Sequence, residues 1–257
     1  MRMVSWNVNG IRACWESGLR EFLEKERPEI VLFQEVKSQL ASLPEEIATP
    51  SGYRSYWHCG GRPGYSGVAA FVRSDQEQPC WMIKGLGVPE IDAEGRVLTL
   101  EFADFFLITA YFPNSGAGGR RLEFKSEFCR LIRLFGERLA ERGKGVILTG
   151  DFNIAPHDLD LYSVDANRGE PGTLPAEVAW MNELTDSGWV DLFRRDREGE
   201  EGHYSWWSFF DEDRANNRGW RIDHAVATSE LAARLEAELR PDIFGSDHCP
   251  LITRLRR

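Results

Sequence analysis

Short apolar runs, each closed by a polar residue, divide the chain into predicted strands and helices. A continuous apolar run is typical of a strand covered on both faces, whereas an apolar residue every three or four positions indicates a helix. Strands are expected at residues 3–6, 30–33, 67–72, 97–102, 105–112, 146–148, 221–227 and 251–255. Little helix lies between the strands of the 67–112 region, which favours antiparallel neighbours there.

Helical spacing predicts a helix around residues 19–23 and a longer amphipathic one over residues 128–139 that ends near Gly143. Two further helices are expected, one after Pro175 and one from Ser229. The chain shows no repeat, low-complexity tract or linker. We therefore expect a single domain over residues 1–257 in which sheet and helix are mixed.

Composition and charge narrow the class of protein. The chain has 257 residues, of which 42% are hydrophobic and 28% charged, so it can bury a full core. The 41 acidic and 31 basic side chains leave a formal charge of −10. An acidic protein does not bind nucleic acid by general electrostatics, so a polyanionic partner requires a local basic patch or metal ions.

The cellular location follows from the cysteines and from the absence of long apolar runs. Five cysteines without a CxxC pair indicate reduced, buried thiols rather than a disulfide framework or a zinc site. No apolar run approaches the roughly 20 residues that span a bilayer, and the N-terminus turns polar too early for a signal peptide. We expect a soluble, unprocessed protein without membrane contact, located in the cytoplasm and associated with the nucleoid, or in the nucleus of a eukaryote.

Polar residues placed just after strand ends carry the candidate chemistry, because side chains from separate strands converge on one rim of a sheet. They are Asn7, Asn9, Glu35, Tyr111, Asn114, Asp151, Asn153, Asp223, Asp247 and His248. Carboxylate and amide oxygens without cysteine or paired histidine are hard ligands. The set therefore indicates Mg²⁺ or Mn²⁺ rather than Zn²⁺.

Each fragment also has a structural interpretation. Glu35 alone is typical of a solvated turn, and Asp151 and Asn153 are typical of a turn whose side chains cap the backbone. Asp223 and His248 form a pair that also occurs for purely structural reasons. No single fragment decides between function and structure.

Taken together and in this order, the fragments resemble the exonuclease III and AP endonuclease family of the endonuclease/exonuclease/phosphatase superfamily. The matching blocks are Ser5-Trp6-Asn7-Val8-Asn9-Gly10-Ile11-Arg12, Gln34-Glu35-Val36-Lys37, Gly64-Tyr65-Ser66-Gly67-Val68-Ala69, Tyr111-Phe112-Pro113-Asn114, Gly150-Asp151-Phe152-Asn153-Ile154-Ala155, Asn217-Arg218-Gly219-Trp220-Arg221-Ile222-Asp223 and Gly245-Ser246-Asp247-His248-Cys249-Pro250. The resemblance implies an α/β fold, a four-layer α/β/β/α sandwich of two mostly antiparallel sheets packed face to face with flanking helices.

The resemblance also implies roles for the residues. The implied catalytic residues are Tyr111, Asp151, Asn153, Asp223 and His248. The implied metal ligands are Asn7, Glu35, Asp151, Asn153 and Asp247. The implied substrate-binding residues are Asn9, Asn114, Arg121, Trp206, Trp220 and Ile222.

The function that follows is a Mg²⁺-dependent DNA-repair nuclease, with Mn²⁺ able to substitute. It would hydrolyse the phosphodiester 5′ to abasic sites in double-stranded DNA, trim 3′ ends as a 3′–5′ exonuclease, and act as a monomer. A phosphoesterase for a small-molecule or lipid-headgroup phosphoester is the alternative. A non-catalytic binder is disfavoured, because every predicted catalytic position is filled.

The sequence can be compared with the family pattern at two positions that bear on DNA contacts, and it also suggests a basic rim. Asn9 resembles bacterial members of the family, since animal members have aspartate there, and Ala117 stands where some relatives have an arginine that enters the DNA stack. A basic rim for the DNA backbone is predicted from residues in or beside the matched loops. They are Lys37, Arg62, Arg121, Lys125, Arg168, Arg218 and Arg221.

Overall fold

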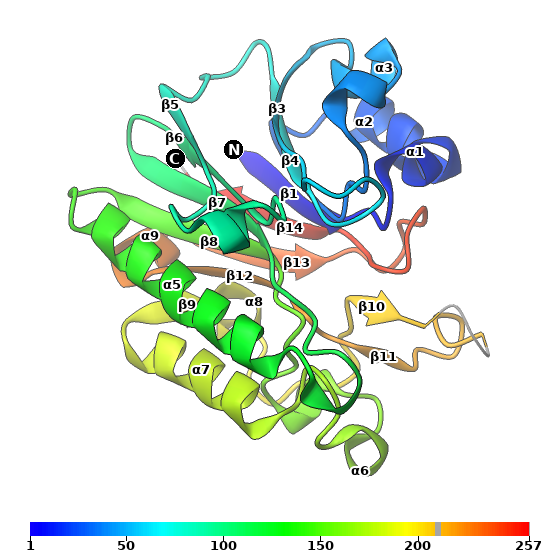
Figure 1. Cartoon of the computed structure of the whole chain (residues 1–257), viewed down its shortest axis with the longest axis vertical. Helices are drawn as coiled ribbons and strands as arrows, with labels where there is room; N and C mark the ends of the chain where they lie inside the picture. Colours follow the sequence, from blue (N-terminus) through cyan, green and yellow to red (C-terminus); the bar gives the residue numbers. More distant parts are fainter. Residues whose placement is uncertain (209–211, 257) are drawn as a thin grey trace.

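Two six-stranded sheets form the centre of the protein, in a computed structural model that describes residues 1–208 and 212–256 (Figure 1). The first sheet has the order β13 (Leu235–Leu239), β14 (Leu251–Leu255), β1 (Arg2–Asn7), β2 (Ile30–Gln34), β4 (Val68–Arg73) and β3 (Tyr53–His58). The second has the order β5 (Trp81–Lys84), β6 (Val97–Glu101), β7 (Phe105–Tyr111), β8 (Gly145–Asp151), β12 (Asp223–Thr228) and β9 (Trp189–Asp191). Within these sheets only the pairs β1/β2 and β7/β8 are parallel.

Helices cover the outer faces of both sheets. The first sheet carries α1 (Ile11–Cys14), a π-helical turn at Trp15–Leu19, α2 (Arg20–Glu26) and α3 (Glu45–Ala48). The second carries α5 (Leu122–Ala140) and α7 (Pro175–Asp186), which lie side by side in Figure 1. The shorter helices are α4 (Pro89–Asp92), α6 (Val164–Asn167), α8 (Leu192–Arg195) and α9 (Ser229–Ala232), and a two-stranded ribbon joins β10 (Trp206–Trp207) to β11 (Gly219–Trp220).

The alternation of side chains along β2 shows how the sequence produces the layers. Ile30 and Leu32 belong to the core between the two sheets, whereas Val31 and Phe33 pack under the outer helices. Both faces of the strand are therefore apolar, which explains the unbroken apolar run. The predicted four-layer sandwich is confirmed.

All eight predicted strands are present, with ends shifted by up to three residues. β3, β5, β9 and β13 were not predicted from the sequence. The helix expected from Ser229 lasts four residues, and residues 235–239 form a strand instead. The segment Leu-Glu-Ala-Glu-Leu consists of good helix formers, so pairing with β14 overrides its local preference.

The structure can be compared with two sequence-based expectations, that the cysteines are buried thiols and that no segment crosses a membrane. All five cysteines are free thiols, but Cys80 is exposed, so the expectation that all are buried is wrong. Across residues 1–208 and 212–256, no helix combines the length and apolar character needed to cross a membrane.

Candidate active site

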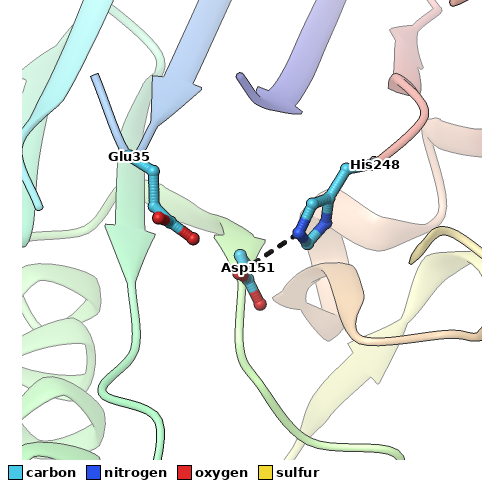
Figure 2. A group of neighbouring side chains, drawn as sticks. All are labelled: Glu35, Asp151 and His248. Atoms are coloured by element: carbon cyan, nitrogen blue, oxygen red, sulfur yellow. Dashed lines mark ion pairs between the residues drawn. The ribbon is translucent and has the colours of Figure 1, made fainter. Parts of the chain in front are cut away.

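Strand ends from both sheets converge on a single group of side chains (Figure 2). Glu35 directly follows β2, Asp151 is the last residue of β8, and His248 precedes β14. In Figure 2 the three side chains point toward one another, and one ligand atom from each lies within 4.8 Å of the others. The predicted convergence of these three residues is confirmed.

Three of the predicted site residues have a left-handed backbone conformation, which sets the direction of their own side chains. Asn9, Glu35 and Asn153 have φ angles of 44°, 52° and 51°. Such angles are uncommon for residues other than glycine and cluster at functional sites. Two of these turns have the same hydrogen-bond pattern. The side chain of Asn7 accepts from the Asn9 N–H at 2.9 Å, and the side chain of Asp151 accepts from the Asn153 N–H at 2.8 Å.

Glycine is required before Asp151. Gly150 has a φ of 147°, and a Cβ there would collide with the backbone carbonyl of Ala110 on the neighbouring strand β7. The close approach of β7 and β8 places Tyr111 opposite Asp151. β12 pairs on the other side of β8 and places Asp223 opposite the same aspartate.

Asn7 links the two central carboxylates. Its amide nitrogen donates to Glu35 Oε1 at 2.9 Å and to Asp151 Oδ2 at 2.8 Å. Its amide oxygen accepts the Asn9 N–H, so the side chain presents a donor to the carboxylates. Asn7 is fully buried and holds the two acids at a fixed separation.

Lys37, which the sequence indicated only as part of a basic rim, neutralises Glu35. Its Nζ lies 2.7 Å from Glu35 Oε2 and also contacts the side-chain oxygen of Asn9. Burial by itself raises the pKa of Glu35, but Lys37 and the hydrogen bond from Asn7 outweigh it, and the pKa falls below its ordinary value. Glu35 is therefore ionised at neutral pH.

His248 lies between two buried carboxylates. Its Nδ1 is 2.8 Å from Asp223 Oδ2, and its Nε2 is 3.9 Å from Asp151 Oδ2. Burial alone lowers the pKa of His248, but the charges of Asp223 and Asp151 outweigh it and raise the pKa to about 10. Burial also raises the pKa of Asp151. The positive charge of His248 opposes this rise, and the negative charge of Asp223 adds to it. The histidine is therefore positively charged beside a carboxyl group that holds a proton more readily than usual.

Asp247 orients the aromatic side of the site. Its Oδ1 accepts from the Asn9 amide at 3.0 Å, and its Oδ2 accepts from the Trp206 indole N–H at 3.1 Å. Both oxygens are thus occupied by side-chain donors. Asp247 lies beside the cluster of Glu35, Asp151 and His248 rather than within it.

A pocket of about 260 Å³ opens above these groups. Its lining residues are Glu35, Tyr111, Asn114, Asp151, Asn153, Pro171, Gly172, Trp206, Trp220, Ile222, Asp247 and His248. One wall is apolar, because Trp206 and Trp220 are paired across the β10/β11 ribbon with ring centres 6.1 Å apart, and Ile222 packs with them. Gly172, with a φ of 105°, approaches Trp220 so closely that an added Cβ would lie 3.1 Å from its ring.

Asn114 and Tyr111 add polar groups to the lining of the pocket. The Asn114 amide donates to the side-chain oxygen of Asn153 at 3.1 Å. The guanidinium of Arg96 lies 4.6 Å from the centre of the Tyr111 ring, a cation–π contact that was not predicted from the sequence. Burial, reinforced by the charge of Glu35, raises the pKa of Tyr111 well above its ordinary value, so the phenol keeps its proton.

Five of the seven predicted DNA-contacting side chains already form ion pairs within the protein, including Lys37 with Glu35 and Arg168 with Asp158. Arg121 does not line the pocket; it donates to Tyr65 and to Glu94, each at 2.7 Å. The prediction that Lys125 and Arg221 belong to a basic rim is wrong, because both are fully buried. Arg62, Arg168 and Arg218 are exposed as expected, and Lys37 is partly exposed.

Arg221 instead holds together a buried ionic cluster beneath the pocket. It binds Asp160 through two nitrogens, at 2.7 and 3.1 Å, and Asp191 at 2.9 Å. Burial raises the pKa of each aspartate, but the charge of Arg221 dominates and lowers both. A depressed carboxyl pKa contributes stability that is present above the unfolded-state pKa and lost as the pH falls toward the folded-state pKa.

We expect Arg221→Met to reduce the free energy of unfolding by about 3 to 5 kcal/mol at pH 7, because it removes the cation that two buried carboxylates share and leaves only Arg194 paired with Asp160 and the His224 ring near Asp191. Without the arginine both carboxyl pKa values rise, so the loss of stability on acidification begins at a higher pH than the value of about 5 expected for the wild type. Urea unfolding between pH 3 and pH 8 measures both effects. Arg218→Met, which removes an exposed neighbour, is the control, and equal stability of the two variants would contradict the assignment.

A larger hollow of about 590 Å³ over β13 and α8 is not a competing site. Its arginines are already bound: Arg195 to Asp196, Arg254 to Glu238 and Arg197 to the carbonyl of Ala237. Among the described residues, no group of acids and bases with strongly shifted pKa values lines this hollow.

Comparisons with known proteins agree with this geometry. The sequence profile described as "Endonuclease/Exonuclease/phosphatase family" matches residues 4–248. The chain is 38% identical to an exodeoxyribonuclease of Bacillus subtilis, covering 98% of both chains, and 35% identical to the DNA repair nuclease APEX1 of Danio rerio, covering 98% of this chain and 81% of that one. Among solved structures, the AP endonuclease LMAP from Leishmania major matches with a TM-score of 0.90 at 28% identity, covering 100% of this chain and 87% of that one. The matched region contains every predicted site residue.

Proposed function

This chain belongs to the endonuclease/exonuclease/phosphatase family, in its exonuclease III and AP endonuclease branch, and from that premise we propose a DNA-repair nuclease that hydrolyses the phosphodiester 5′ to abasic sites. The observation that carries the proposal is the position of the Asp151–His248–Asp223 group at the base of a pocket with one apolar wall. The charged groups suit a phosphodiester, and the aromatic wall suits a sugar without a base. We further expect the enzyme to trim 3′ ends and to act as a monomer on double-stranded DNA.

A divalent metal ion fits the donor set. Glu35 and Asp151 offer hard oxygen ligands, His248 is the only imidazole among the described residues of the cluster, and its Nδ1 is already bound to Asp223, so Mg²⁺ suits the site better than Zn²⁺. We propose that Glu35 is the main ligand, that Asp151 contributes, and that Mn²⁺ can substitute. When bound, the ion supplies positive charge to the phosphoryl oxygens and lowers the barrier to attack by water.

The protein side chains supply the remaining requirements of phosphodiester hydrolysis. We propose that Asp151 orients water and accepts its proton, and that Asn153, which accepts a hydrogen bond from Asn114, holds that water or a phosphate oxygen. The Nε2 of His248 faces the pocket while Asp223 holds Nδ1, so the imidazolium can donate to a phosphate oxygen. Tyr111 lies near the proposed position of the departing 3′ oxygen.

The apolar wall accounts for the choice of abasic sites. A deoxyribose without a base can rotate into the slot between Trp206, Trp220 and Ile222. A normal nucleotide must first be unstacked, at a cost of a few kcal/mol, and then does not fit. Selection is therefore by steric exclusion rather than by hydrogen bonds to a base.

We expect Trp206→Ala or Trp220→Ala to lower kcat/KM on abasic DNA by about tenfold or more and to reduce discrimination against intact duplex, because both variants enlarge the slot. Kinetics on matched abasic and intact duplexes, well below each melting temperature, measure the ratio. Trp81→Ala, at an exposed tryptophan on the edge strand β5, is the matched control. Unchanged discrimination in both slot variants would show that these tryptophans only pack.

The proposed activity is tested on one duplex that carries an abasic analogue, incubated with and without Mg²⁺. We expect a single nick, with a 3′ hydroxyl on one side and a 5′ deoxyribose phosphate on the other, only when the metal is present. Sizing and end-group analysis of the products give the position of the cut. An intact duplex accompanied by rapid phosphate release from inositol phosphates would instead support the phosphoesterase alternative.

A further inference from the structure

A buried ion pair lies directly behind the pocket wall. Lys125 on α5 and Glu177 on α7 are 0% and 2% exposed, and Nζ lies 2.7 Å from Oε1. Neither residue is among those to which the proposed reaction gives a role. Replacing a buried ion pair by apolar side chains often leaves stability unchanged or improves it, so stability alone does not explain this pair.

The lysine end of the pair holds the turn that contains two proposed catalytic residues. Lys125 Nζ donates to the backbone carbonyl of Asn153 at 2.6 Å. Asn153 has a φ of 51°, and its side chain contacts both Asp151 and Asn114. Lys125 therefore binds the main chain at the strained residue on which the position of the water-binding amide depends.

The glutamate end holds two loops that line the same pocket. Glu177 Oε1 also accepts from the Ser115 hydroxyl at 2.5 Å, next to Asn114. Glu177 Oε2 accepts the backbone N–H groups of Gly172 and Leu174, at 2.7 and 2.9 Å. Gly172 packs against Trp220, so a single carboxylate fixes loops beside the polar wall and the apolar wall.

We propose that Lys125 and Glu177 are positioning residues, which set the distance between the water-binding amide of Asn153 and the Gly172 side of the abasic slot. The inference rests on the proposed nuclease function for its kinetic consequence. Its structural consequence, the placement of Asn153 and Gly172 in the protein without metal or DNA, is independent of that function.

Glu177→Gln is the sharpest test, because each carboxylate oxygen accepts from two donors. Whichever way the amide is turned, its NH₂ group faces donors and one set of hydrogen bonds is lost. We expect kcat on abasic duplex to fall by about 10- to 100-fold with KM changed less than about twofold. We also expect the side-chain amide resonances of Asn153 and Asn114 to move in NMR spectra of the metal-free protein.

Glu101→Gln is the matched control. Glu101 accepts from Lys144 at 2.7 Å and from Arg142 at 3.1 Å, next to the start of β8. Asp151 ends that strand, about 20 Å away at the usual rise per residue. Glu101→Gln is expected to lower the melting temperature without changing kcat or the two amide resonances.

The outcomes separate the possibilities. If Glu177→Gln lowers the melting temperature but leaves kcat and both resonances at wild-type values, the pair is only structural and the proposal is overturned. If Glu177→Gln fails to fold, Ser115→Ala, which removes a single donor to Glu177, decides by the same readouts with smaller effects. If the wild type does not cleave abasic DNA, the nuclease function fails, and the resonances alone decide on positioning.

Discussion

Asp151→Asn and His248→Ala are each expected to lower kcat on abasic duplex by about 10³-fold or more. Asp151 is the proposed base for the attacking water. Among the described residues, His248 is the only histidine that lines the pocket, and its Nε2 lies 3.9 Å from Asp151 Oδ2. Both groups act in one chemical step. DNA binding is expected to remain roughly intact, because neither substitution removes exposed basic charge.

The double variant tests whether the two residues act together. Because they share one step, Asp151→Asn/His248→Ala should be scarcely slower than the poorer single variant. Single-turnover rates and fluorescence-anisotropy titrations measure chemistry and binding separately. Asp75→Asn, at a surface aspartate paired with Arg73, is the control and should match the wild type. Losses that multiply would indicate independent roles.

Glu35→Ala is expected to reduce activity by about 10²-fold or more at low Mg²⁺, with part of the loss recovered at high Mg²⁺ or Mn²⁺. Glu35 is half-buried and stays ionised because Lys37 and Asn7 lower its pKa, which suits it to bind a hard cation. Rates over a metal titration give the apparent metal affinity. The expected change is a weaker affinity together with a lower maximum rate.

Two comparisons make this result decisive. Glu35→Gln keeps the shape and one oxygen, so it should retain more metal affinity than alanine. Wild-type protein in EDTA should be inactive and should recover when Mg²⁺ is restored. Full activity in EDTA, or a Glu35→Ala variant with an unchanged metal titration, would refute the assignment of Glu35.

The convergence of the site could be predicted because it depends on strand ends. Glu35 and Asp151 stand at the ends of recognisable apolar runs. Asp223 begins β12, which runs antiparallel to β8, so the start of β12 shares an edge with the end of β8. The edge strands could not be predicted in the same way. Residues 235–239 form a strand only because they pair with β14, and the local sequence pattern does not predict this pairing.

The burial of charged residues was the principal failure of prediction. Lys125 and Arg221 look like surface residues, because an isolated basic side chain in a loop or helix is usually exposed. Their partners lie far away in the chain: Glu177 is 52 residues from Lys125, and Asp160 is 61 residues from Arg221. Only the folded chain shows that these cations neutralise buried acids.

The pairing of β1 with β14 has a consequence for protein synthesis. Asn7 and Asp151 are separated by 144 positions, and the backbone carbonyl of His248 accepts from the Trp6 indole across 242 positions. Contacts of such long range form late, because loop closure must precede them. A nascent chain still lacking its last strand on the ribosome therefore has no assembled cutting site. Because β14 pairs with β1, the order of synthesis itself delays the assembly of the proposed active site until the last strand has been made.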